Sequence, residues 1–419
     1  MMKNKPYAWV PSLYLAEALP YVAVMVIATT MYKRLGLSNT DLALYTSWLY
    51  LPWVIKPLWS PFVASIRTER WWVLLMQLLI GAGFAGIAFT LPMAFWLQGS
   101  LAFFWILAFA SATHDIAADG LYILGLSTHD QSLYVGVRST FYRIGNIVGQ
   151  GLLVMLAGWL EKSQTIAVAW SISFFVLAGT FIALWLWHSI ALPKPAPTPA
   201  REEGKVSGLW YDFWLALKTF FTKPHIVSAL FFMLLFRFPE GQLVKIANPF
   251  LLDSAEAGGL ALSTEAVGFI YGTVGIIGLT VGGLLGGWCV SRHGLKRWLW
   301  PMVLSISLPD LVYVYLADAG EASFFVVNLC VFIEQFGYGF GFTAYMLYLV
   351  YFSQGERSTA VFSICTAMQA LGMMLPGMIA GWMADHLGYL RFFWWVVACC
   401  LVTFAVSAFI KIDPNYGKK

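Results

Sequence analysis

Residues 99–124 read GSLAFFWILAFASATHDIAADGLYIL, a stretch that begins apolar and then carries His114, Asp115 and Asp119. As a helix it rises about 1.5 Å per residue, so it can cross the roughly 30 Å hydrocarbon core of a bilayer. A charge at that depth is expensive, roughly 2.5–3.5 kcal/mol for Asp at a helix centre on the mildest scales. The least costly place for such charges is a water-filled cavity between helices, which is typical of a membrane transporter.

The same apolar character recurs along the whole chain. Of 419 residues, 60% are hydrophobic and only 11% are charged, whereas soluble domains are about 25% charged. Apolar runs of about 20 residues alternate with polar turns, which predicts an all-α membrane protein with twelve transmembrane helices in two six-helix bundles. The predicted spans are 8–31, 42–64, 72–93, 99–124, 134–160, 165–189, 224–252, 265–288, 297–317, 321–349, 357–382 and 390–411.

The longest predicted loop divides these spans into two sets of six. It begins with alternating prolines, which form a stiff extended stretch, and ends in a pattern typical of an amphipathic helix on the membrane surface. A plain linker with some apolar residues is the alternative. We expect an N-terminal bundle over 1–190, a cytoplasmic linker with this helix over 191–222, and a C-terminal bundle over 223–419. Most basic residues outside the spans fall on the side of this loop and both termini, which predicts that side as cytoplasmic.

Prolines interrupt the first and seventh spans at corresponding places in the two halves. Pro20 lies beside Glu17, and Pro239 lies beside Glu240. Interrupted helices at matching positions of two repeats indicate a central binding site.

Four carboxylates within spans are the predicted proton-coupling residues. Asp115 and Asp119 are four residues apart and share one face of a helix. Two carboxylates stacked at low dielectric repel each other, so we expect one of them to hold a proton near neutral pH. Glu17 and Glu334 lie in matched helices of the two halves and are candidates for a second proton site. The alternative is that the aspartates pair with Arg143 or Lys56 for folding alone.

Basic, polar and aromatic side chains within the spans are the predicted substrate-binding residues. Arg143 and Asn146 belong to a polar stripe on the fifth span, and the planar guanidinium fork suits a carboxylate or phosphate. Lys245 has no close sequence partner and is a candidate for an anion, whereas Arg237 and Glu240 either bind substrate or neutralise each other. The predicted set is Lys56, His114, Tyr142, Arg143, Asn146, Arg237, Glu240, Lys245 and Trp53.

Signatures of other chemistry are absent from the sequence. It contains no P-loop, no GxGxxG after a strand, no HExxH and no GxSxG, so we expect no enzyme, no catalytic residue and no cofactor. Its five cysteines lie in apolar segments without CxxC spacing, so we expect no metal site. The net charge of +4 follows from basic residues kept on one side of a membrane, so no nucleic acid is expected. We expect the protein to be a monomer, and its expected partners are the bilayer, protons and a small anionic substrate.

Several motifs resemble the AmpG muropeptide permeases. They are Glu17-Ala-Leu-Pro20, Tyr50-Leu-Pro-Trp-Val-Ile-Lys-Pro-Leu-Trp-Ser-Pro61, His114-Asp-Ile-Ala-Ala-Asp119 and Gly337-Tyr-Gly-Phe-Gly-Phe-Thr-Ala-Tyr345. The resemblance covers most of the chain, and the acetyl-coenzyme A transporters share the Asp-Ile-Ala-x-Asp-Gly pattern. One departure is His114, where the family usually has glutamine. Another is the expected count of twelve spans, where some AmpG permeases have fourteen.

This resemblance implies a major facilitator superfamily fold with a central cavity and alternating access. It implies proton-driven uptake of anhydromuropeptides, the sugar-peptide fragments of cell-wall turnover, across a bacterial inner membrane. By motif match, Lys56, Asp115 and Asp119 are carried over as functional positions.

We therefore expect a secondary active transporter, a proton-coupled symporter of an anionic sugar-peptide with both termini cytoplasmic. One alternative is a transporter of another anionic metabolite, such as an acyl-coenzyme A or a siderophore. A second alternative is a membrane sensor or scaffold that does not transport. The many charges within spans favour transport, because a scaffold gains nothing from them.

Overall fold

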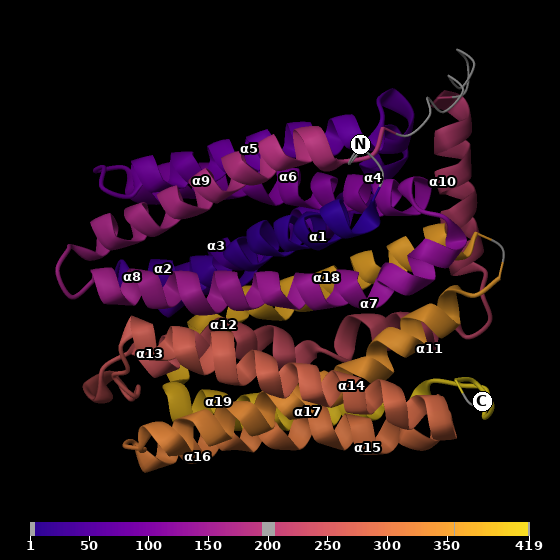
Figure 1. Cartoon of the computed structure of the whole chain (residues 1–419). Coiled ribbons are helices and arrows are strands. Elements are labelled where there is room, and N and C mark those ends of the chain that lie inside the picture. Colours follow the sequence, from indigo (N-terminus) through magenta and orange to yellow (C-terminus); the bar gives the residue numbers. More distant parts are fainter. Residues whose placement is uncertain (1–4, 195–205, 356, 418–419) are drawn as a thin grey trace. The chain divides into compact units, whose positions relative to one another are not determined.

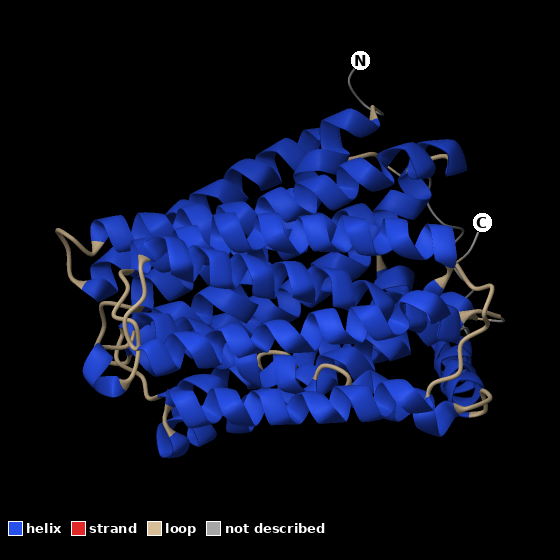
Figure 2. Ribbon diagram, turned by 90° about the horizontal axis from the view of Figure 1, so that it is seen from below, coloured by secondary structure: helices blue, strands red, loops and turns tan. Residues whose placement is uncertain are grey.

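A computed structural model describes residues 5–194, 206–355 and 357–417, and every regular element among them is a helix (Figures 1 and 2). Within these described ranges, eleven helical stretches are long and apolar enough to cross a membrane. The prediction of an all-α membrane protein is confirmed. Of the predicted linker, residues 195–205, with most of its alternating prolines, lie outside the described part.

Figure 1 labels the α-helices. The helices of the first half are α1 (Pro6–Val22), η1 (Ala23–Ile27), α2 (Ala28–Arg34), α3 (Asn39–Trp48), α4 (Leu51–Ile66), α5 (Glu69–Thr90), α6 (Trp96–Gly125), α7 (Thr128–Asn146), η2 (Ile147–Leu153), α8 (Val154–Leu160) and α9 (Ile166–Ala191). Those of the second half are α10 (Val206–Phe221), α11 (Ile226–Leu235), α12 (Phe238–Leu252), η3 (Ala255–Ala257), α13 (Thr264–Phe269), η4 (Ile270–Gly275), α14 (Ile276–His293), α15 (Leu295–Ser307), η5 (Leu308–Asp310), α16 (Leu311–Ala319), α17 (Phe324–Ser353), α18 (Ser358–Leu387) and α19 (Tyr389–Phe409). Here η1, η2 and η4 are π-helical, and η3 and η5 are 3₁₀-helical.

The second predicted span, 42–64, is not one continuous helix. It divides into α3 and α4, with a turn at Leu49 and Tyr50. Pro52 explains the break, because it has no N–H to donate to the carbonyl of Trp48 four residues earlier, and its ring clashes with that carbonyl. Within α4, Pro52 occupies the second position, where a missing N–H leaves no intrahelical bond unmade. The eleven long apolar stretches found in the described chain do not include this segment.

The two proline sites of the first and seventh spans differ in structure. The chain stays helical through Pro20 and then widens into the π-segment η1. At the other site α11 ends at Leu235 and α12 begins at Phe238, so that Pro239 lies in the first turn of α12. Proline thus interrupts the seventh span, as predicted, but only disturbs the hydrogen-bond ladder of the first.

The described chain forms two compact units. One contains the residues up to Met31 together with Ile55–Phe213, and the other contains Tyr32–Val54 together with Trp214–Lys419. The segment 32–54 therefore packs with the second half of the chain, where α3 lies along α18. We call them the first and second unit, and the predicted bundle boundaries at 190 and 223 stay a prediction.

Glycines set how closely the helices of the first unit approach. A Cβ on Gly145 would lie 2.7 Å from the Cβ of Ala18 and 3.1 Å from the carbonyl oxygen of Leu15. A Cβ on Gly149 would overlap Val22. These two glycines of the fifth span thus bring α7 and η2 against α1 and η1.

The amphipathic helix predicted at the end of the linker is present as α10. Ala216 and Phe220 are buried in the second unit, whereas Tyr211, Trp214 and Phe221 are exposed. That this helix lies on the membrane surface stays a prediction.

Candidate functional site

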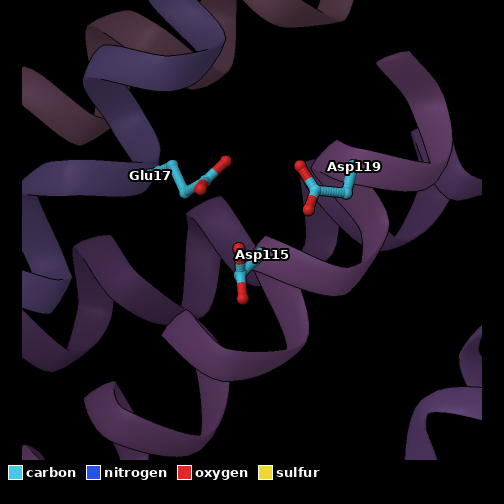
Figure 3. A group of neighbouring side chains, drawn as sticks. All are labelled: Glu17, Asp115 and Asp119. Atoms are coloured by element: carbon cyan, nitrogen blue, oxygen red, sulfur yellow. The ribbon is translucent and has the colours of Figure 1, made fainter. Parts of the chain in front are cut away.

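Three carboxylates from two helices of the first unit meet in one cluster. Glu17 comes from α1, and Asp115 and Asp119 come from successive turns of α6 (Figure 3). One oxygen from each lies within 4.8 Å of the others. We call Glu17, Asp115 and Asp119 the carboxylate cluster. The predicted shared face of the two aspartates is therefore occupied by a third acid, which the sequence assigned to a separate site.

Two basic residues pair with the aspartates of this cluster. The Lys56 ammonium of α4 donates to Asp115. Arg138 of α7 pairs with Asp119, with Nη2 lying 2.6 Å from Oδ1. The Tyr14 hydroxyl also donates to Asp119, at 3.2 Å. Of the two partners expected for the aspartates, Lys56 pairs with Asp115, whereas Asp119 pairs with Arg138 in place of Arg143. The sequence did not indicate Arg138 as a partner.

The charges of this site do not cancel. Three carboxylates face two cations, so one unit of negative charge remains when every acid is ionised. At 4.8 Å and an effective dielectric constant of about 20, two carboxylates repel by about 3.5 kcal/mol. Glu17 is only 7% exposed, and its Oε2 has no hydrogen-bond partner within the described chain. One proton would make the cluster neutral.

Carboxylate oxygens this close could also ligate a metal ion, but Lys56 and Arg138 already pair with two of the three acids.

His114 belongs to a separate buried network rather than to the cluster. Its Nε2 lies 3.1 Å from the Gln77 amide, which also contacts His188 Nδ1 at 2.8 Å. The other ring nitrogen of His188 lies 2.9 Å from the Ser12 hydroxyl. His114, Gln77 and His188 are fully buried. These contacts tie α1, α5, α6 and α9 together, so the side chain predicted to bind substrate is engaged in packing inside the first unit.

The predicted polar stripe on α7 lies beside a π-segment. Asn146 is the last residue of α7, and η2 begins at the next residue. Arg143 and Tyr142 are half-buried, and Tyr142 packs against the core of the first unit. Arg143 makes no ion pair among the residues that the structure describes, so its guanidinium remains available to an anion. π-segments frequently occur at functional sites.

Lys245 in the second unit is a buried cation without a carboxylate partner in the described chain. It is 1% exposed, donates to the Thr46 hydroxyl at 2.9 Å and lies 5.0 Å from the ring centre of Tyr50. Thr46 lies on α3 and Tyr50 in the turn after it, so both contacts come from the first part of the second span. Trp53 follows in the first turn of α4 and is half-buried.

Arg237 and Glu240 do not form an ion pair in the structure. The Arg237 guanidinium donates to the Tyr338 hydroxyl at 2.6 Å and lies 4.8 Å from the ring centre of Phe342. Both charged residues are 8% exposed. An arginine over aromatic faces at a helix interruption is an arrangement that can hold an anion through its remaining N–H groups.

Glu334 lies in another buried polar group of the second unit. Its Oε2 accepts from the Tyr313 hydroxyl at 3.3 Å and from Gln335 Nε2 at 2.9 Å. Tyr313 in turn is hydrogen-bonded to Tyr271 of η4. The sequence analysis missed both tyrosines, because each comes from a different span.

Long apolar helices around buried charged groups are the architecture of multi-pass membrane transporters. The sequence profile of the Major Facilitator Superfamily matches residues 12–375, and the chain belongs to that superfamily. It is thus a membrane transporter with a small-molecule substrate, and not an enzyme.

Related proteins support this assignment. The chain is 24% identical to the anhydromuropeptide permease of Escherichia coli strain K12 over 393 residues, which cover 89% of this chain and 73% of the permease. It is 25% identical to an uncharacterized protein of Haemophilus influenzae over 362 residues, covering 82% and 80%. A solved structure of a mutant of the nucleoside transporter NupG matches with a TM-score of 0.74 at 14% identity, covering 96% and 99%. A D-xylose-proton symporter matches at 0.70 and 13% identity, covering 98% and 99%, so these structures share the fold.

Proposed function

We propose that this protein is a proton-coupled symporter that moves an anionic sugar-peptide, of the anhydromuropeptide class, by alternating access. The relative named anhydromuropeptide permease and the sequence motifs favour this substrate. The observation that carries the proton coupling is the carboxylate cluster, which holds three acids against two cations.

The proton-coupling step follows from the charge of this cluster. With one proton bound, three acids and two cations sum to zero, which suits a conformational change across a low-dielectric membrane. When the proton leaves, Glu17, Asp115 and Asp119 repel one another, and Lys56 and Arg138 are left with one carboxylate in excess. Gain and loss of one proton therefore change the electrostatic energy of the contact between α1 and α6 by several kcal/mol.

Substrate recognition in the second unit is assigned to two cations. Lys245 and Arg237 are buried, and in the described chain neither is neutralised by an ion pair. Burying a cation without a counter-charge is costly, so a ligand carboxylate would recover part of that cost. The Phe342 and Tyr338 rings beside Arg237 offer apolar faces for a sugar ring. In the first unit, Arg143 and Asn146 of α7 are the further candidates.

Another anionic metabolite, such as an acyl-coenzyme A or a siderophore, satisfies the same cations and is the main alternative substrate. A sensor or scaffold that does not transport is disfavoured, because the uncompensated charges of both units serve no purpose in it.

We further propose that the protein is a monomer in a bacterial inner membrane, with both termini cytoplasmic. The basic residues outside the spans support this orientation.

Uptake by purified protein in proteoliposomes tests the proposal. With a more alkaline interior, the liposomes should accumulate labelled anhydromuropeptide, and a protonophore should abolish the accumulation. Acyl-coenzyme A and siderophore tested in parallel would identify the alternative substrates. Equal uptake with and without the gradient would contradict proton coupling, and no accumulation of any of these solutes would contradict the proposed substrate class.

A further inference from the structure

Glu334 belongs to a buried group of hydrogen-bonded side chains in the second unit. It sits in the middle of α17, with 3% of its surface exposed. Tyr313 of α16 is fully buried, and Tyr271 of η4 is 8% exposed. The three side chains come from three different spans and form one chain of hydrogen bonds, from Tyr271 to Tyr313 to Glu334.

Among the residues that the structure describes, Glu334 has hydrogen-bond donors beside it but no basic residue paired with it. The Tyr313 hydroxyl and Gln335 Nε2 contact its carboxyl oxygens, and no ion pair to it occurs within the described residues. Its other electrostatic neighbours are Asp310 and Glu240, which are acids. A lone carboxylate buried at membrane depth costs far more than a neutral carboxyl group, so this environment selects the proton-bound form.

Tyr271 adds a second, independent feature. It lies in the π-segment η4, which interrupts the helix that runs from Thr264 to His293. π-segments are rare and frequently occur at functional sites. The irregularity places a hydroxyl against Tyr313 at the more exposed end of the hydrogen-bonded chain.

We propose that Glu334 is a second proton-binding site, separate from the carboxylate cluster, with Tyr313 and Tyr271 as its proton relay. On loading, an O–H bond forms at a Glu334 oxygen as the Tyr313 O–H bond breaks. Tyr313 regains its proton from Tyr271, and Tyr271 regains its proton from water. Release runs the same steps in reverse. This inference rests on the burial and contacts of the second unit and does not depend on which substrate is carried.

Infrared spectroscopy of the purified protein in lipid tests the site without any transport assay. At neutral pH the wild-type spectrum should contain a protonated-carboxyl C=O band that Glu334→Gln removes. The matched control Glu321→Gln, at an exposed acid before α17, should leave that band unchanged. If Glu334→Gln instead lowers the carboxylate stretching bands and leaves the C=O band intact, Glu334 is ionised and the proposal is wrong.

A second variant keeps the test decisive if Glu334→Gln does not fold. Tyr313→Phe retains the aromatic packing but removes the hydroxyl that contacts Glu334, so the C=O band should change frequency. Tyr315→Phe, at an exposed tyrosine of the same helix, should not alter the band. Identical spectra for Tyr313→Phe and the wild type would show that no protonated carboxyl contacts Tyr313, and this too would overturn the proposal. If the infrared spectra show a protonated Glu334 but the proteoliposomes do not accumulate substrate, only the proposed substrate or its coupling to protons is rejected.

Discussion

Arg138 contacts Asp119 directly and also contacts Tyr14, a second hydrogen-bond donor to Asp119. Its Nη2 lies 2.6 Å from Asp119 Oδ1, and its guanidinium lies 4.4 Å from the ring centre of Tyr14, whose hydroxyl donates to the same carboxylate. This triangle joins α1, α6 and α7 at the carboxylate cluster. It makes Arg138 part of the electrostatic balance of the site, together with Lys56.

A double-mutant cycle should measure this pairing. Arg138→Gln and Asp119→Asn should each destabilise the protein, and the double variant should lose less than the sum of the two. We expect a coupling energy of about 0.5–3 kcal/mol, the range for residues in direct contact. The measurement is unfolding of the protein in lipid nanodiscs. Additive losses would mean that the two side chains do not interact.

Lys245→Met should raise the stability of the ligand-free protein and lower its affinity for a carboxylated ligand. It removes a buried charge that no carboxylate of the described chain neutralises while keeping most of the side-chain volume, so the ligand-free protein should gain about 1–3 kcal/mol of stability. Binding of a carboxylated ligand should weaken by about 1.5–3 kcal/mol, the scale of a hydrogen bond to a charged group. Thermal shifts with and without ligand report both quantities. Lys218→Met, at an exposed lysine of α10, is the control. A destabilised variant with normal affinity would assign Lys245 to folding.

Gln77→Leu should destabilise the first unit without changing the charge of the cluster. The Gln77 amide lies between His114 and His188, and its loss leaves buried ring nitrogens without a partner. Each unsatisfied buried group costs about 1–3 kcal/mol. Thermal unfolding in nanodiscs measures the loss, with Gln164→Leu at an exposed loop position as the control. A variant as stable as the wild type would show that this network contributes little to packing.

Cysteine labelling in intact cells should fix the orientation. The native cysteines are all buried, so they give little background. Ser254→Cys, in the exposed loop after α12, should react with an impermeant thiol reagent added outside. Ser291→Cys, at an exposed position near the end of α14, should react only after the cells are opened. The reverse pattern would place the termini outside.

Periodicity and spacing predict much of this fold, because a membrane helix must satisfy its backbone internally and face lipid with apolar side chains. The shared face of Asp115 and Asp119 and the close approach at Gly145 follow from such local rules. The break between α3 and α4 could have been found from Pro52, whose effect on the preceding helical turn is also local.

Contacts between spans are what local rules miss. Arg138 lies four residues before Tyr142 on the polar stripe of α7, but in the sequence it reads as a basic residue at the inner end of a span. Its partner Asp119 and the Tyr313 contact of Glu334 depend on the relative rotation and height of separate helices. Side-chain packing between helices sets this relative rotation and height, which residue spacing within one helix does not predict.

Transport by Asp119→Asn tests the central claim most directly. Wild-type and variant proteins are reconstituted in proteoliposomes, and accumulation driven by a pH gradient is compared with counterflow in the absence of a gradient. Asp318→Asn, at an exposed acid near the end of α16, serves as the control. If the carboxylate cluster couples the proton, Asp119→Asn loses accumulation and retains counterflow. A folded Asp119→Asn protein that still concentrates substrate as the wild type does would contradict the account.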